Sequence, residues 1–272
     1  MSGPAWTEGT QPSVVGQGYP DTPGLHSAEQ VAAWRKVTDA VHRAGGTIFA
    51  QIMHTGRIGH PSLLPDDLHP VAPSAVPAKG QIHTHEGPKD FVTPRELTEA
   101  EIGQTVDDFA AAARNAIAAG FDGVELHGAN GYLIQQFLAP NSNRRTDAWG
   151  GSAEGRIRFA VEVATAVAGA IGGQRVGLRL SPGNPYNDIA EDDVEETYGA
   201  LVARLVPLGL AYLHLVEGSD RDLTNMIAFG SLFLANPDLP ARLAAGGPYN
   251  TPDPAAFFGG DHRGYTDYPA LT

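Results

Sequence analysis

The sequence of 272 residues contains no cysteine, which excludes disulfide bonds, thiolate metal ligands and a thiol nucleophile. Basic residues are scarce, since 18 lysines and arginines stand against 31 acidic residues, a formal net charge of −13. An acidic chain without a basic stripe is a poor candidate for binding nucleic acid or an anionic membrane. No apolar run approaches the roughly 20 residues that span a bilayer, and Met1 starts no signal peptide. We expect a cytoplasmic protein whose partner is a small molecule.

Hydrophobic residues make up 42% of the chain, which is enough for a proper core. Glycine (33) and proline (21) are abundant but show no collagen-like period, so we interpret them as turns between many short elements. No break in composition indicates a linker. We therefore expect one domain over residues 1–272.

Helices and strands alternate along the predicted chain. Capping boxes at Ser27 with Gln30 and at Thr98 with Glu101 begin two helices. The predicted helices cover about 27–44, 98–120, 155–171 and 191–206, the last with Glu191, Asp192 and Asp193 at its positive end. The predicted strands cover about 47–52, 122–127, 176–180, 212–216 and 226–229, with a weaker one at 4–10. This α/β alternation predicts a parallel sheet, either an open doubly wound sheet or a (β/α)8 barrel.

One connection is too short for this pattern. Only nine residues, 217–225, separate the last two clear strands, whereas a crossover between parallel strands needs about a dozen or more. The count is six strands at most, and a closed barrel has eight.

A long loop rich in proline and histidine, about 54–97, is a candidate functional loop because ordinary connections are shorter. Its histidines do not have the spacing of metal ligands, so we expect no metal site there. These histidines are His54, His60, His83 and His85.

Polar residues at the predicted strand ends are the candidates for chemistry, because catalytic residues of such folds lie there. The candidates are Gln51, Arg179, the turn His127–Tyr132 and the turn at Gly230. The imidazole of His127 and the carboxamide of Asn130 are neutral donors that suit an oxygen gaining negative charge. The phenol of Tyr132 is a suitable proton donor to a carbanion or enolate.

The segment around this turn carries a family resemblance. His-Gly-Ala-Asn-Gly-Tyr-Leu-Ile-Gln-Gln-Phe-Leu (127–138), Pro-Asn-Ser-Asn-Arg-Arg-Thr-Asp (140–147) and Trp-Gly-Gly-Ser (149–152) resemble the signature of the Old Yellow Enzyme family. Its members are FMN-dependent, NAD(P)H-oxidising ene-reductases built on a (β/α)8 barrel. The resemblance continues, in the family's order, at 16–24, 49–51, 176–182, 236–239 and 264–269.

The resemblance implies a role for each strand-end residue. His127 and Asn130 would bind the activating oxygen of the substrate, and Tyr132 would protonate its α-carbon. Gln51 would hydrogen-bond the pyrimidine edge of the flavin, and Arg179 would stabilise the reduced ring on its N1/O2 side.

Flanking matches imply further contacts. Gly9 would lie against the flavin by its backbone, and the Gly230 turn would contribute to cofactor binding. Tyr265 would line the substrate side. Met53 would lie beside the substrate, where many members have tryptophan.

The chain also departs from the family. A first strand and helix have no counterpart, and a strand–helix unit is missing between Asn225 and Met226, so the barrel would lack strands 1 and 7. The missing unit carries the glycine-rich loop that wraps the FMN phosphate, and Ser231 replaces an arginine that usually pairs with that phosphate. Missing strands would leave unpaired edges, which association into a homo-oligomer could cover.

The implied function is hydride transfer from NADPH or NADH through FMN to the activated C=C bond of enones, maleimides or nitroalkenes. The alternative is a truncated, non-catalytic family remnant with weak or no FMN binding. A glycosidase would need two facing carboxylates, and the strand ends offer amide, imidazole and guanidinium groups instead.

Overall fold

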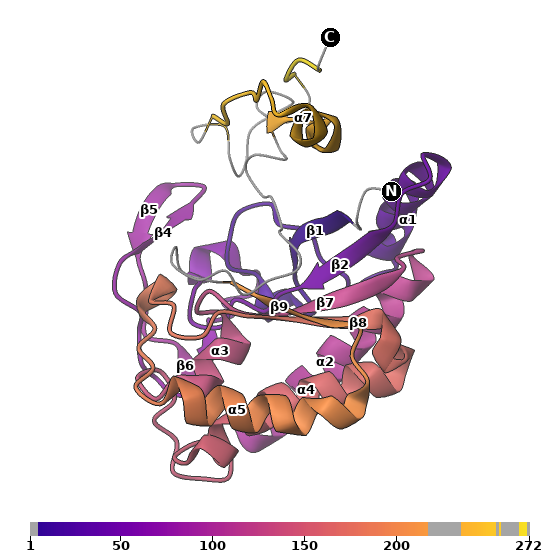
Figure 1. Ribbon diagram of the computed structural model, residues 1–272. Helices are drawn as coiled ribbons and strands as arrows, with labels where there is room; N and C mark the ends of the chain where they lie inside the picture. The colour runs from indigo at the N-terminus through magenta and orange to yellow at the C-terminus, as the bar shows by residue number, and fades with distance from the viewer. Residues whose placement is uncertain (1–4, 217–234, 254–255, 257–266, 271–272) are drawn as a thin grey trace. The chain divides into compact units, whose positions relative to one another are not determined.

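The computed structural model describes residues 5–216, 235–253, 256 and 267–270 (Figure 1). The chain forms two compact units, Gly3–Arg221 and Asp222–Thr272, the second including Met1–Ser2. Whether the whole chain acts as one domain stays a prediction. The predicted strand at 226–229 lies outside the described residues.

A five-stranded parallel sheet organises the first unit, with the strand order β1-β2-β7-β8-β9. All four predicted strands that fall within the described residues are confirmed, and the weaker one near the N-terminus is also a strand. The strands are β1 (Ala5–Thr10), β2 (Ile48–Ile52), β7 (Gly123–Gly128), β8 (Val176–Leu180) and β9 (Tyr212–Leu215).

The predicted helices are confirmed, and both capping boxes form. The side chain of Ser27 accepts a hydrogen bond from the backbone of Gln30, and Thr98 accepts one from Glu101. A short helix that the sequence did not predict, α3, follows β7. The helices are α1 (Ala28–Arg43), α2 (Glu99–Ala118), α3 (Leu133–Leu138), α4 (Ala153–Ile171) and α5 (Val194–Leu205).

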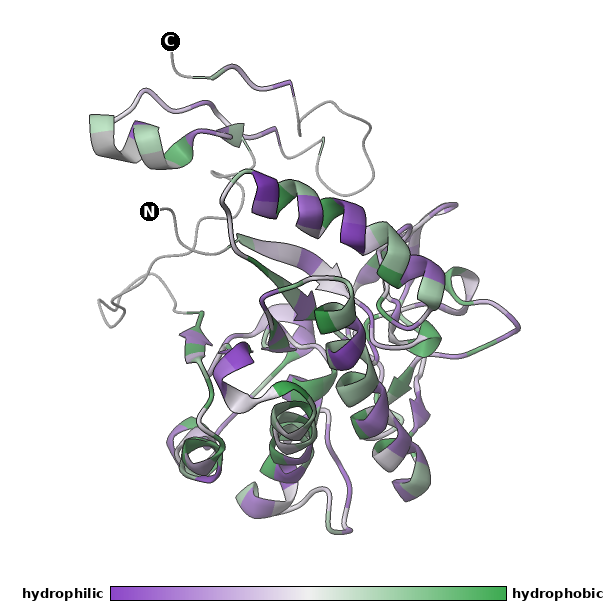
Figure 2. Ribbon diagram, turned by 90° about the vertical axis from the view of Figure 1, so that its right-hand side faces the viewer, coloured by the Kyte–Doolittle hydropathy of each residue, from purple (hydrophilic) through white to green (hydrophobic). Residues whose placement is uncertain are grey.

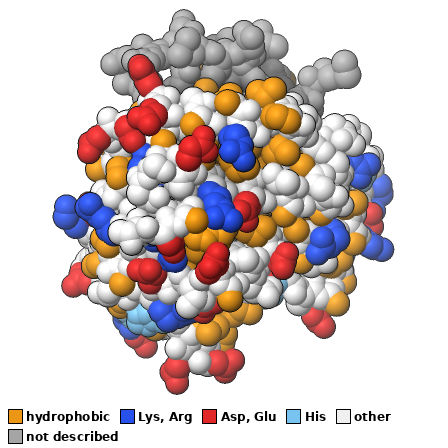
Figure 3. Space-filling view, turned by 90° about the horizontal axis from the view of Figure 1, so that it is seen from below, with side chains coloured by type: hydrophobic (Ala, Val, Ile, Leu, Met, Phe, Trp, Pro, Cys, Tyr) orange, Lys and Arg blue, Asp and Glu red, His pale blue; other side chains and the backbone are white. Residues whose placement is uncertain are grey.

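Helices α2, α4 and α5 cover one face of the sheet (Figure 1). The hydropathy colouring shows helices that carry both hydrophobic and hydrophilic residues (Figure 2), and in α2 the buried Ile102, Val106 and Phe109 recur at the spacing of one helix face. Residues of the strands that face these helices are fully buried, among them Ala50, Val124, Leu126 and Leu178. The outer surface seen from below intersperses acidic and basic side chains with apolar ones (Figure 3). The core therefore lies between the sheet and this helix layer.

The opposite face of the sheet is concave. Trp6 on β1 donates a hydrogen bond of 2.7 Å to the hydroxyl of Tyr212 on β9, although these strands form the two edges of the sheet. In a flat sheet, four strand spacings would separate the edge strands by about 19 Å. The sheet must therefore curl, as the wall of a barrel does. Gly177 permits the tight packing inside the curl, because a Cβ there would collide with the Tyr212 ring.

The long loop after β2 is more ordered than we expected, and its assignment as one long connection without strands was wrong. It contains a hairpin and a short parallel strand pair, and four apolar residues within it form a second small core. The strands are β3 (Val71–Ala72), β4 (Gln81–Thr84), β5 (Gly87–Asp90) and β6 (Arg95–Glu96), and the core residues are Ile58, Leu63, Ala78 and Ile82. This core packs against Tyr19 and Tyr132, so the loop supports the candidate site.

The acidic run before α5 has two different roles. Asp193 is the residue at the helix N-cap, as expected, although its side chain makes no capping hydrogen bond. Glu191 instead accepts hydrogen bonds from the backbone of Gly183 and the hydroxyl of Tyr198. Glu191 therefore precedes the helix by three residues, where hydrogen bonds to Gly183 and Tyr198 hold its carboxylate.

In the second unit, helix α7 (Leu239–Ala245) is fixed by side-chain bonds to loop backbone. Arg242, only 3% exposed, donates to the carbonyl oxygens of Pro248 and Pro269, and Asn236 and Asn250 bond to each other. Across the part of the chain that is described, no helix combines the length and apolarity needed to cross a membrane.

Candidate active site

The strand register places the predicted site residues side by side on the concave face. His127 on β7 is paired with Arg179 on β8, which is paired with His214 on β9. Two residues before His127 on β7, Glu125 is paired with Gln51 on β2, and Gln51 is paired in turn with Gly9 on β1. The side chains at these positions alternate with those that face the helices, so they point to the concave side.

His127 is a neutral hydrogen-bond donor. Its ring is 4% exposed, and its Nδ1 accepts a hydrogen bond of 3.3 Å from the backbone of Ala129. The proton of the neutral ring therefore resides on Nε2. Burial, together with the charges of Arg179 and His214, lowers the pKa of His127 to about 3. At neutral pH the imidazole can donate from Nε2 without carrying charge.

Asn130 lies in a strained turn that neighbouring side chains hold in place. Its φ of 55° falls in the left-handed region, which asparagine tolerates better than most residues. Ser181 accepts a hydrogen bond from the Asn130 backbone N–H, and Asn187 donates to the Asn130 carbonyl oxygen. Within residues 5–216 the carboxamide itself makes no hydrogen bond, and its Oδ1 is buried. The amide is therefore available to a ligand.

Tyr132 contacts both His127 and Tyr19. Its ring meets that of His127 edge to face, with centroids 5.0 Å apart, and its hydroxyl lies 2.9 Å from the Tyr19 hydroxyl. Burial raises the pKa of Tyr132, and hydrogen bonding to Tyr19 and Asn187 and the charge of Arg179 oppose the rise. The phenol is protonated at neutral pH, as a proton donor must be.

The side chains of Gln51 and Arg179 are polar groups on the concave face, and their hydrogen-bonding chemistry suits the ring of a flavin. The Nε of Arg179 is buried and has no hydrogen-bond partner within the described residues, and burial lowers the pKa of this guanidinium against the opposing charge of Glu125. Gln51 is 7% exposed and uses its Nε2 to bond Glu125. An unpaired cationic donor beside an amide suits a heteroaromatic ring that has acceptor atoms and an N–H along one edge.

Gly9 and Met53, predicted on the cofactor and substrate sides, lie in contact. A Cβ on Gly9 would collide with the end of the Met53 side chain, so a larger residue at position 9 would displace Met53. Met53 is 8% exposed. Gly230, Ser231 and Tyr265 lie outside the described residues.

Sequence analysis did not single out two residues of this site, Tyr19 and Glu125. Tyr19 lies in a turn 113 residues before its partner Tyr132, so no local pattern connects them. Glu125 is fully buried in the middle of β7. The sequence could have identified Glu125, because a carboxylate inside an otherwise apolar strand needs buried hydrogen-bond partners.

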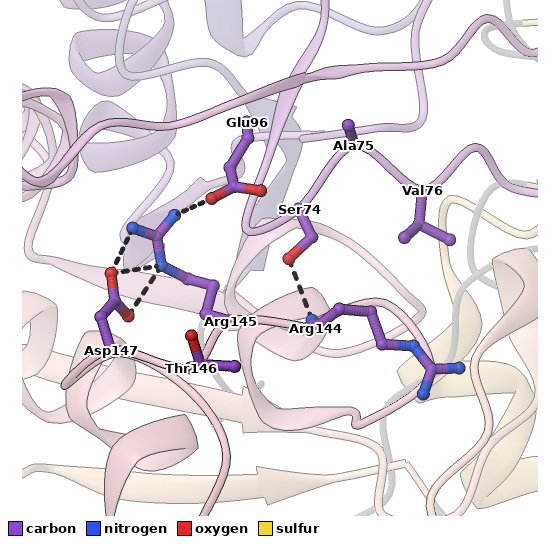
Figure 4. Close-up of a pocket in the computed structure, with 8 residues that line it drawn as sticks. All are labelled: Ser74, Ala75, Val76, Glu96, Arg144, Arg145, Thr146 and Asp147. Carbon is purple, nitrogen blue, oxygen red and sulfur yellow. Dashed lines mark hydrogen bonds and ion pairs between the residues drawn. The ribbon is translucent and has the colours of Figure 1, made fainter.

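A surface hollow elsewhere is lined by Arg144, Arg145 and their neighbours (Figure 4). Arg145 pairs with Asp147 and Glu96, and it also donates to the carbonyl oxygen of Leu97. These bonds satisfy Arg145 internally and tie its loop together. The hollow therefore has a structural explanation, and the concave face of the sheet is the better candidate site.

Comparisons with known proteins agree with this placement. Residues 5–223 match the sequence model of the NADH:flavin oxidoreductase / NADH oxidase family. The chain is 42% identical to a putative 12-oxophytodienoate reductase 5 of Oryza sativa subsp. japonica, over 97% of this chain and 81% of that protein. It is 40% identical to a probable flavin mononucleotide-dependent alkene reductase of Leishmania infantum, over 97% of this chain and 84% of that protein.

The alignment to the rice protein also bears on the short connection after β9. It extends over 307 positions, more than the 272 residues of this chain, so the rice protein has internal residues with no counterpart here. The family match ends at residue 223, within the connection of 217–225 that is too short for a crossover. The alignment length does not place these residues along the chain, so a strand–helix unit missing at 217–225 stays a prediction.

Solved structures give the same family. Morphinone reductase superposes with a TM-score of 0.92 at 38% identity, over 98% of this chain and 83% of that chain. An old yellow enzyme homologue from Zymomonas mobilis also gives 0.92, at 35% identity, over 98% of this chain and 86% of that chain. The sheet of this protein is thus part of a (β/α)8 barrel, and the chain belongs to the Old Yellow Enzyme family of FMN-dependent NAD(P)H oxidoreductases.

Proposed function

We propose that this protein reduces the activated C=C bond of enones, maleimides or nitroalkenes, with NADPH or NADH as the reductant. The observation that carries the proposal is the pairing of a neutral Nε2–H donor on His127 with the phenol of Tyr132, 5.0 Å away between ring centroids. A donor for an oxygen and an acid for a neighbouring carbon are the two groups that such a reduction requires.

His127 and Asn130 bind the carbonyl or nitro oxygen of the substrate. Both donors are neutral, so they stabilise negative charge as it develops on that oxygen without forming a tight ion pair beforehand. The hydrogen bonds from Asn130 to Ser181 and from Asn187 to Asn130 support this role, because they fix the turn that carries the amide.

Tyr132 donates the proton to the α-carbon. Its raised pKa keeps the hydroxyl protonated, and the hydroxyl of Tyr19 at 2.9 Å fixes its direction. Gln51 and Arg179 bind the isoalloxazine ring, with Gly9 approaching it by its backbone and Met53 and Tyr265 bordering the substrate. The Gly230 turn contributes to cofactor binding. FMN, when bound, supplies the redox centre that accepts hydride from the nicotinamide and returns it to the β-carbon.

The test is turnover by the purified protein saturated with FMN under anaerobic conditions. We expect NADPH or NADH oxidation that depends on 2-cyclohexenone, N-ethylmaleimide or a nitroalkene, with a saturated product identified by mass spectrometry. Protein that binds FMN, as judged by its yellow colour, but reduces none of these alkenes would refute the proposed substrate class. Protein that stays colourless in excess FMN would instead support a non-catalytic remnant.

A further inference from the structure

Glu125 is a buried carboxylate in the middle of the sheet, and the proposed chemistry gives it no role. It lies on β7 between Val124 and Leu126, which face the helices, and none of its surface is exposed. Burying a carboxylate without partners is expensive, so its neighbours must compensate with hydrogen bonds and opposite charge.

Side chains from two other strands, β2 and β9, meet this carboxylate, and Tyr212 on β9 is among them. Gln51 on β2, directly opposite in the register, donates from Nε2 to Oε1 at 2.7 Å. The Nδ1 of His214 on β9 lies 3.0 Å from Oε2. Arg179 adds a cation nearby, because the charge of Glu125 acts to raise the pKa of this guanidinium. Glu125 thus joins three strands across the concave face.

The contact fixes the orientation of the Gln51 carboxamide. A carboxylate only accepts hydrogen bonds, so only the amide NH₂ can face it. This chemical argument selects one of the two amide orientations, which otherwise differ only by exchange of oxygen and nitrogen. The other end of the amide, Oε1, forms no hydrogen bond within residues 5–216. The Oε1 of Gln51 is therefore free to accept a hydrogen bond from a ligand on the concave face.

We propose that Glu125 is a positioning residue that orients the Gln51 carboxamide so that its Oε1 accepts a hydrogen bond from the N3–H of the isoalloxazine ring. This rests on the proposed binding of the flavin ring by Gln51. Arg179, whose buried Nε is unpaired within the described residues, supplies the complementary donor for the carbonyl side of the ring.

The test compares riboflavin with 3-methylriboflavin, which lacks the N3–H, by quenching of flavin fluorescence. The wild type should prefer riboflavin. Glu125→Gln has nearly the same shape but lets the Gln51 amide turn either way, so the preference should fall about threefold to tenfold, the worth of one neutral hydrogen bond. The exchange Gln51→Glu with Glu125→Gln should restore the preference, because a carboxylate at position 51 presents an acceptor in either orientation.

A matched control separates orientation from general disruption of the network. His214→Gln alters a different partner of Glu125 and leaves the contact with Gln51 in place, so it should keep the preference for riboflavin. An unchanged preference in Glu125→Gln, or an equal loss in His214→Gln, would overturn the proposal.

The apoprotein gives a readout that needs no flavin. The side-chain amide resonance of Gln51, assigned with Gln51→Ala, should lie downfield in the wild type because it donates to a carboxylate, and it should move upfield in Glu125→Gln. If the wild type binds neither flavin, flavin recognition by Gln51 fails together with the proposed function. A downfield resonance would then show that Glu125 still orients the amide, and an unshifted one would refute the orientation as well.

Discussion

At the scale of single residues, burial sets the protonation of two groups in the site: it keeps the imidazole of His127 neutral and the phenol of Tyr132 protonated. The ring of His127 stays neutral because burial and the nearby Arg179 and His214 oppose a second proton. Tyr132 keeps its proton because burial outweighs the hydrogen bonds and charge that favour the phenolate. Both groups are thus set for their proposed roles before any ligand arrives.

The sharing of one oxygen by His127 and Asn130 makes their mutations interdependent. We predict that His127→Ala and Asn130→Ala each weaken the binding of a phenolic ligand by about tenfold, the worth of one hydrogen bond to a charged oxygen at its lower end. The double variant should lose less than the sum, because residues that act as a unit are not additive. Titration through the flavin charge-transfer band measures this. Strict additivity would mean that the two donors serve different atoms.

The buried histidines predict how stability depends on pH. Burial lowers the pKa of His54 to about 3, as it does for His127, from the usual histidine value of about 6.5. Between these values the unfolded chain binds a proton that the folded protein does not, so stability is complete above about pH 6.5 and falls on acidification. Each histidine contributes about 1.4 kcal/mol per pH unit in this range.

Replacement of one buried histidine should therefore make the free energy of unfolding depend less steeply on pH. His54→Gln should reduce the slope of unfolding free energy against pH, measured by urea unfolding between pH 6 and 4, by about one proton. His85→Gln, which changes a ring that is 59% exposed, is the control. A slope that responds equally to both substitutions would show that burial of His54 is not its cause.

At the scale of elements, a buried network of hydrogen bonds from Ser181 and Gln135 fixes the turn between β7 and α3. Ser181, fully buried after β8, accepts from the Asn130 backbone and donates to Gln135. Gln135 also accepts from Gly131 and donates to the Ser181 carbonyl oxygen. The residue that follows β8 thus fixes the turn that follows the neighbouring strand β7, which carries the proposed catalytic residues.

Because of this network, a substitution of Ser181 should weaken ligand binding although Ser181 has no proposed contact with the ligand. Ser181→Ala should destabilise the protein by about 1–3 kcal/mol, through unpaired buried groups, and weaken phenolic ligand binding severalfold because Asn130 loses its anchor. Ser142→Ala is the matched control, since Ser142 is equally buried but bonds only to the carbonyl oxygens of Gln136 and Ala139. Ser142→Ala should cost stability alone. Equal ligand-binding losses in both variants would exclude the anchoring role.

The helices and strands that could be predicted from the sequence are those marked by a pattern of neighbouring residues. The capping boxes at Ser27 and Thr98 marked two helices because a capping bond spans only three residues. The six-residue α3 was missed because its run of apolar and glutamine residues, all buried, has no polar face. The hairpin β4–β5 was missed because histidine, proline and glycine obscure its alternation.

The same distinction applies to the site. Strand-end position alone identified Gln51, His127 and Arg179 as candidates, and the structure brings them together. Tyr19 and Glu125 act through partners 113 and 74 residues away in sequence, and only the folded sheet and its loops bring these pairs into contact.

At the scale of the whole molecule, the described sheet ends in an exposed strand. On β9 the outward side chains of Leu213 and Leu215 are 39% and 41% exposed, whereas the matching residues of β7 and β8 are fully buried. Within residues 5–216, β9 pairs on one side only. The strand–helix unit that we predict to be missing would follow at this edge of the barrel in the family order.

Loss of that unit predicts weak recognition of the FMN phosphate. The family's glycine-rich loop and the arginine replaced by Ser231 would supply backbone donors and countercharge. Two charged hydrogen bonds at about 1.5–3 kcal/mol each correspond to about 10²–10⁴ in affinity. Isothermal titration should show riboflavin binding nearly as tightly as FMN. Ser231→Arg should improve FMN binding and leave riboflavin binding unchanged, whereas a strong preference of the wild type for FMN would show that another segment holds the phosphate.

The catalytic cycle of the whole enzyme is tested most directly by separating its two half-reactions in FMN-saturated Tyr132→Phe with stopped-flow absorbance. If Tyr132 is the proton donor, flavin reduction by NADPH or NADH should keep its wild-type rate. Alkene-dependent reoxidation should slow by about 10²–10⁴-fold, the usual contribution of general acid catalysis. Equal slowing of both half-reactions, or no slowing of either, would contradict the assignment of Tyr132 and with it the proposed mechanism.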